Sequence, residues 1–186
     1  MIVREAIVSL YGAWRLARLD ARGFELFDKT PAGAMRSFYA AVLVAPMYAA
    51  VALMLPVAHA GSGGLRWLLV ETIAYVVSWL AYPVVAEQLT RSMGCRQRFE
   101  GYLSAYNWSM VLQNAVLLPL AGLTALDVLP ANLTQILWLV ALVAIMGYLW
   151  FIVRTALEVG AFAAAGLVLL DELLSMLIDG IAAGLS

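Results

Sequence analysis

Two adjacent carboxylates, Asp171 and Glu172, stand inside the apolar stretch LVLLDELLSML. Ionisable side chains are costly within a bilayer and usually face the interior of a helix bundle or a water-filled cavity. Because burial and a like-charged neighbour both favour the neutral acid, we expect at least one of the two to be protonated at neutral pH. Such a pair could relay protons, bind a cation, meet another subunit, or join helices as a neutral hydrogen-bonded group.

Further polar side chains recur on the faces of neighbouring apolar segments. Glu71, Tyr75 and Ser78 are four and three residues apart and so share one face of a helix. Counted at about 1.5 Å per residue, Ser78 and Asn114 fall at nearly the depth of Asp171, close to the middle of the bilayer. The candidate intramembrane polar site comprises Asp171, Glu172, Asn114, Gln113, Ser78, Tyr75 and Glu71. We expect a neutral Asp171 or Glu172 to hydrogen-bond with Asn114, Gln113, Ser78 or Tyr75.

Residue types that support catalysis or metal binding are scarce. The chain has one cysteine, Cys95, and one histidine, His59, too few for a cluster with metal-ligand spacing. It has no phosphate-binding or dinucleotide fingerprint and no nucleophile with a neighbouring base. We therefore expect no enzymatic activity, no metal and no cofactor.

The amino-acid composition indicates the class of protein in which these polar side chains lie. Apolar residues make up 65% of the chain and charged residues 12%, whereas soluble domains are about 45–50% apolar. A helix needs about 20 mostly apolar residues to cross a bilayer, and five segments qualify: about 34–58, 65–89, 102–125, 133–154 and 159–183. The predicted fold class is all-α, a polytopic membrane protein whose five transmembrane helices form a bundle over residues 31–186.

The distribution of cations predicts an orientation. If the N-terminus is cytoplasmic, ten of the eleven Lys and Arg residues lie on the cytoplasmic side and only Arg66 lies outside. Lysine and arginine favour cytoplasmic loops, so the prediction is N-in and C-out. Arginine outnumbers lysine ten to one beside abundant Ala, Leu and Val, a bias that suggests a GC-rich bacterial genome. The expected location is the bacterial inner (cytoplasmic) membrane.

Residues 1–30 precede the first span and are predicted to form an amphipathic interfacial helix and a linker. Apolar residues including Ile7, Leu10 and Trp14 fall on one side, while Ser9 and Gly12 fall on the other with charged residues. The residues expected to contact lipid at this interface are Arg15, Arg18, Trp14, Arg91, Arg96 and Arg98. The expected partners are the bilayer and anionic lipid headgroups, with no nucleic acid.

Aromatic residues near the ends of the predicted spans are typical of a belt at the membrane interface. Tyr102, Tyr106 and Tyr148 belong to this predicted belt together with most of the tryptophans.

The C-terminal half resembles a known family. GYLSAYNWSMVLQNAVLLPLAG is similar to the middle span of the Yip family of Rab-interacting membrane proteins, and WFIVRTALEVGAFAAAGLVLL is similar to its closing pair of spans. The acidic-Gly-Pro motif of many eukaryotic members is replaced by FELFDKTPAG, which argues against Rab binding. The resemblance implies a bacterial relative that organises membranes or serves as a scaffold and forms oligomers, and it assigns no functional residue.

Three functions are compatible with these patterns. The favoured one is a membrane-organising or accessory scaffold protein without catalysis of its own, associated with further copies or a membrane complex. The first alternative is a small proton- or cation-coupled transporter or channel subunit that uses Asp171, Glu172, Asn114 and Glu71. The second is an accessory subunit of a larger membrane enzyme complex.

Overall fold

All regular structure that the computed structural model describes, in residues 2–54 and 64–185, is helical. This confirms the predicted all-α class. The elements are α1 (Ile2–Ala17), η1 (Ala21–Leu26), α2 (Pro31–Ser37), α3 (Tyr39–Met54), α4 (Gly64–Ser92), η3 (Arg96–Arg98), α5 (Phe99–Ala125), α6 (Ala131–Leu157) and α7 (Ala161–Leu185).

Five segments are long and apolar enough to cross a membrane, which confirms a multi-pass membrane protein. They are Pro31–Leu53, Gly64–Ser92, Arg96–Ala125, Ala131–Leu157 and Ala161–Leu185. The bounds predicted for the last four spans differ from those of α4 to α7 by three residues or fewer. The predicted end of the first span, residues 55–58, and His59 lie outside the described residues.

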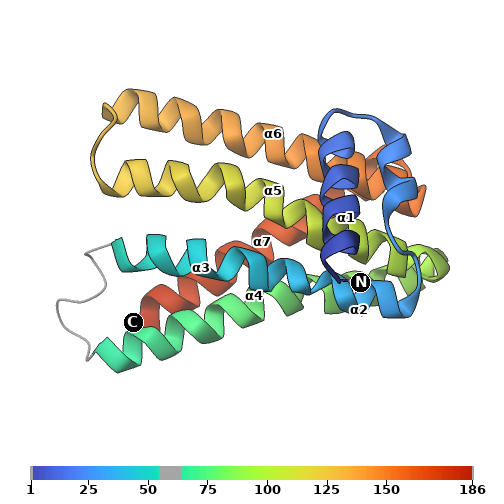
Figure 1. Cartoon of the computed structure of the whole chain (residues 1–186), viewed down its shortest axis with the longest axis horizontal. Helices are drawn as coiled ribbons and strands as arrows, with labels where there is room; N and C mark the ends of the chain where they lie inside the picture. Colours follow the sequence, from blue (N-terminus) through green and yellow to red (C-terminus); the bar gives the residue numbers. More distant parts are fainter. Residues whose placement is uncertain (1, 55–63, 186) are drawn as a thin grey trace.

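The long helices run lengthwise and α1 crosses them (Figure 1). Helices α5 and α6 form an antiparallel hairpin, α4 packs on α7, and α3 packs on α5. We call the end of the bundle that holds α1, η1, α2 and η3 the basal end. The opposite end, with the α5–α6 turn at residues 126–130, is the distal end.

Packing is densest in the basal half. Every residue from Gly101 to Ser109 of α5 is buried. Small residues allow this close approach: Ser104 Oγ donates to the Asp28 carbonyl at 2.9 Å, and Asn107 Nδ2 donates to Ser37 Oγ at 2.8 Å. The distal part of α6, in contrast, is almost entirely exposed from residue 131 to residue 140, as a lipid-facing helix would be.

The linker between α1 and α3 is rigidly built. Thr30 caps α2 by accepting from the Gly33 N–H at 3.0 Å, and Pro31 occupies the first helical turn, where its missing N–H costs nothing. Arg36 of α2 then bonds both Glu5 of α1, at 2.8 Å, and Asp28 of the linker, at 2.6 Å. The pair with Glu5 attaches the N-terminal helix to the first span, and the pair with Asp28 attaches the linker to it.

Candidate functional site

Asp171 lies in a cluster of tyrosines contributed by α4 and α5. Its side chain is buried, with 8% exposed, and its Oδ1 accepts a hydrogen bond from the Tyr106 hydroxyl at 2.8 Å. The hydroxyls of Tyr82 and Tyr102 lie 2.6 Å apart, and the rings of Tyr82 and Tyr106 are 4.9 Å apart between centroids. We call Tyr82, Tyr102, Tyr106 and Asp171 the tyrosine cluster.

The hydrogen-bond partners expected for Asp171 are wrong. The four side chains expected to bond it each donate a hydrogen bond to another group. Asn114 bonds the Met110 carbonyl, Gln113 bonds Ser109 Oγ, Ser78 bonds the Tyr75 carbonyl, and Tyr75 bonds the Ala41 carbonyl. Three of these bonds stay within one helix, and only the bond of Tyr75 joins two.

The error comes from the assumption that the spans begin at one level. Tyr106 is level with Asp171 but lies eight residues, about 12 Å, from Asn114 along α5. Tyr106 is seven residues from the start of α5 at Phe99, whereas Asp171 is ten residues from the start of α7 at Ala161. Helix α7 therefore begins nearer the basal end than α5 does, and Asn114 and Asp171 do not share a depth. Glu172, half-buried beside Asp171, makes no hydrogen bond or ion pair with any described residue.

Sequence reasoning assigned Tyr102 and Tyr106 to the interfacial belt, which is also wrong. Both are fully surrounded by protein, as is Trp108. Their spacing of four residues places the two rings on one face of α5, and this was the available signal for a shared interior position.

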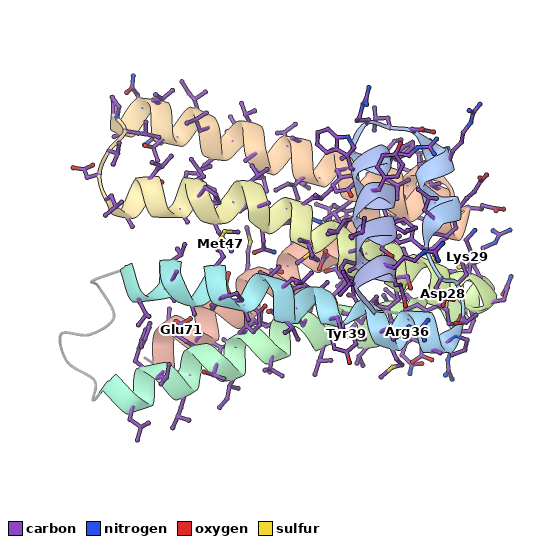
Figure 2. The ribbon with its side chains drawn as sticks, viewed as in Figure 1. Asp28, Lys29, Arg36, Tyr39, Met47 and Glu71 are labelled. Carbon is purple, nitrogen blue, oxygen red and sulfur yellow. The ribbon has the colours of Figure 1, made fainter. Side chains whose placement is uncertain are left out.

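A second polar location contains two of the other predicted residues. Glu71 and Asn114 line a cavity of about 420 Å³ in the distal half, together with Asp179 of α7. The Tyr48 hydroxyl of α3 donates to Glu71 Oε2 at 2.9 Å, and Figure 2 shows Glu71 on the side of α4 that faces α3. The predicted residues therefore do not form one site: Asp171 lies in the buried tyrosine cluster, whereas Glu71 and Asn114 line a distal acidic cavity.

The face of α1 that packs on the rest of the protein is not the one expected from its amphipathic pattern. Ser9, Gly12, Ala13 and Leu16 are buried against the bundle, so the predicted solvent position of Ser9 and Gly12 is wrong. The Tyr148 hydroxyl of α6 donates to the Ala13 carbonyl at 2.8 Å. Small residues on this face permit backbone contact, a role that an amphipathic pattern does not reveal.

The opposite face of α1 is apolar and uncovered. Val3, Ile7, Tyr11 and Trp14 recur at helical spacing and are each more than half exposed. We call these four residues the outward stripe of α1. Arg4 and Arg18 are exposed next to it.

Most of the arginines expected at the lipid interface pair with acids of the basal end. Arg15 bonds Asp20 at 2.8 Å. Further along the chain, Arg91 and Arg96 share Glu87, Arg96 also bonds Glu100, and Arg98 pairs with Glu158 and donates to the Leu157 carbonyl. These guanidinium groups remain partly exposed. They can therefore hold the basal elements together and still meet headgroups.

The charge state of Asp28 reflects its contacts in this region. Hydrogen bonds from the Thr30 hydroxyl and the Thr30 N–H, together with the Arg36 guanidinium, hold the pKa of Asp28 below its ordinary value. Figure 2 shows Asp28 and Arg36 close together at the basal end.

Comparisons with protein-family models, curated proteins and solved structures found no match for this chain. The resemblance to the Yip family therefore stays a prediction.

Proposed function

We propose that this chain is a membrane-organising scaffold protein of the bacterial inner membrane, with a cytoplasmic N-terminus and without catalysis of its own. The observation that carries this proposal is the fixed position of α1. The helix lies across the bundle with its outward stripe uncovered. A helix held in this way can act as a wedge in one leaflet.

The level at which α1 meets the bundle supports an interfacial position. Tyr148, which bonds Ala13, is seventeen residues from the distal start of α6 at Ala131. At about 1.5 Å per residue, the two points are about 26 Å apart, and the hydrocarbon layer is about 30 Å thick. If the distal turn lies at one boundary of the membrane, α1 is close to the other.

The outward stripe has the chemistry of a membrane-inserting face. Val3 is 73% exposed, Ile7 63% and Trp14 53%, and exposed Arg4 and Arg18 flank them. Apolar faces of interfacial helices sink about 5–10 Å into the boundary between headgroups and acyl chains, and flanking cations attract anionic lipid. Because α1 cannot rotate away from the bundle, each copy would add area to one leaflet only.

The tyrosine cluster supports a scaffold over a proton-coupled transporter. Transport through Asp171 needs a polar path from that carboxyl to a surface. Asp171 instead bonds Tyr106, and Tyr82 and Tyr102 bond each other within the buried core. This arrangement is that of a hydrogen-bonded joint between α5 and α7.

Vesicle shape tests the proposal. The full chain is reconstituted in vesicles that contain phosphatidylglycerol, proteolysis in the 18–22 segment identifies preparations with one predominant orientation, and electron cryomicroscopy measures diameter and shape. We expect the wild type to produce smaller or tubular vesicles as its density rises. The double variant Ile7→Ser/Trp14→Ser should leave the vesicles like protein-free ones, while the apolar control Ile7→Leu/Trp14→Phe behaves as wild type.

Two results would overturn the wedge. One is a wild type that changes neither diameter nor shape at any density. The other is a serine variant that remodels vesicles as well as the wild type does, at equal incorporation and equal helicity.

A further inference from the structure

The distal cavity has a size suited to a small molecule. Its volume is about 420 Å³, within the range of about 300–1,000 Å³ for ligand sites. All five spans contribute to its lining: Tyr48, Val51, Ala52, Trp67, Glu71, Asn114, Leu117, Leu118, Ala121, Trp138 and Asp179. Mostly apolar walls with a few convergent polar groups are the usual composition of a binding site.

One side of the cavity is acidic. Glu71 of α4 and Asp179 of α7 come from two helices that pack on each other. The Tyr48 hydroxyl bonds one oxygen of Glu71, which orients that carboxyl and contributes no positive charge. None of the described residues that line the cavity is Lys, Arg or His, so a ligand that balances the acidic side must itself be positive.

The remaining walls are aromatic and aliphatic. Trp67 and Trp138 line the cavity, and the Trp138 indole is held by a hydrogen bond from its Nε1 to Thr124 Oγ1 at 3.2 Å. Faces of tryptophan and tyrosine rings attract cations, most strongly where water is excluded. Leu117 and Leu118 offer apolar contact beside them.

An inorganic cation fits this lining poorly. Calcium takes six to eight oxygen ligands, and magnesium requires a near-ideal octahedron. Within the described ranges, no group of three or more His, Cys, Asp or Glu side chains is placed to hold a metal ion. Two carboxylates on separate helices, in one cavity with indole rings and leucines, instead suit a charged head joined to an apolar body.

We propose that the distal cavity binds a small amphipathic organic cation, an amine or quaternary ammonium compound. Its charged head lies near Glu71 and Asp179, and its apolar part lies against Trp67, Trp138 and Leu117. This binding does not depend on the wedge action of α1, since the cavity and the outward stripe lie in different halves of the bundle and share no residue.

A matched pair of probes isolates the charge. Phenyltrimethylammonium and tert-butylbenzene have the same shape and differ in one positive charge, and binding of each to the full chain in lipid nanodiscs is measured by tryptophan fluorescence and calorimetry. We expect saturable binding of the cation by the wild type. The double variant Glu71→Gln/Asp179→Asn should bind it at least tenfold more weakly, and Trp138→Leu severalfold more weakly.

Controls separate this site from general acidity and from metal binding. Glu172→Gln removes a carboxyl that does not line the cavity, so the affinity for the cation should be unchanged. Calcium chloride should not displace the probe beyond the effect of ionic strength. The single variant Asp179→Asn, at an exposed position, gives a second measurement if the double variant loses helicity, and it should weaken binding as well.

Each of the following results would overturn the proposal: no saturable binding by the wild type, equal affinity for the charged and neutral probes, or unchanged affinity in the folded Glu71 and Asp179 variants. Displacement by calcium at low concentration would assign the cavity to an inorganic cation and would overturn it too.

Discussion

At the scale of single residues, the buried carboxyl of Asp171 is hydrogen-bonded by a neutral hydroxyl and not by a cation. Tyr106 donates to Asp171, and among the described residues no Lys, Arg or His bonds that carboxyl. The residue types and spacing of the last span put Asp171 on an inward face, and the structure buries it. Its partner could not be predicted, because the depth of one helix relative to another depends on packing and not on residue counting. The offset between α5 and α7 decided which side chains meet.

Removal of the Tyr106 hydroxyl tests the joint. Tyr106→Phe leaves Asp171 buried without its donor, and we expect the free energy of unfolding to fall by about 1–3 kcal/mol. Tyr39→Phe, at an exposed tyrosine, should change it by less than about 0.5 kcal/mol. Unfolding in detergent micelles, followed by circular dichroism, measures both. Equal stability of Tyr106→Phe and wild type would contradict a structural role for this bond.

Asp28 gives the basal end a dependence on pH. Its folded-state pKa lies below the ordinary value of 3.8, so the stability it contributes is present above that value and is lost as the pH falls through the folded-state pKa. We expect wild-type stability to decrease on acidification below about pH 4. Asp28→Asn should be less stable at neutral pH and should show a smaller acid-dependent loss.

The exposed carboxyl of Glu25, in the same segment, provides the control. Glu25→Gln should retain the acid-dependent loss of the wild type in the same unfolding measurement. An Asp28→Asn variant with the full wild-type loss would show that other carboxylates account for it.

At the scale of elements, long apolar runs were sufficient to predict the spans. The close contacts made by glycines, in contrast, could not be predicted from the sequence. The bounds of α4 to α7 follow from hydropathy and turn residues, since both act locally. The contact between α1 and η1 depends instead on Gly12 and Gly23, which are eleven positions apart and lie on different elements. A Cβ added at Gly23 would lie 2.6 Å from the Gly12 carbonyl oxygen and 3.0 Å from the Leu16 nitrogen, so only glycine permits this approach of η1 to α1.

Gly23→Ala should therefore loosen the contact between η1 and α1. The nearest atoms belong largely to backbone, so the clash cannot be relieved by a rotamer change, and we expect a loss of about 1–3 kcal/mol in unfolding free energy. Limited proteolysis should also cut faster in residues 17–22. Gly122→Ala is the matched control, because nothing lies within 4 Å of its added Cβ, and alanine in a helix should be neutral or stabilising by up to about 1 kcal/mol. A Gly23→Ala variant as protease-resistant as wild type would contradict this account of the contact.

At the scale of the whole molecule, charge and packing are both concentrated at the basal end. The ten cations other than Arg66 lie there, in α1, the linker, α2, η3 and the nearby ends of α4 and α6. Many of them pair with acids of the same end, but the rule that lysine and arginine favour the cytoplasm counts cations and not net charge. The densely packed part of α5 lies in this basal half, whereas the cavity lies in the distal half.

This asymmetry predicts that the basal end faces the cytoplasm, which cysteine labelling can measure. In a Cys95→Ala background, Val128→Cys places a thiol in the exposed distal turn, and Arg22→Cys places one in exposed η1. In spheroplasts, a membrane-impermeant maleimide should label Val128→Cys without permeabilisation and Arg22→Cys only after it. The reverse pattern would put the outward stripe of α1 in the outer leaflet and would contradict the orientation. Because three spans separate Arg22 from Val128, labelling of both thiols without permeabilisation in sealed spheroplasts would contradict the topology itself.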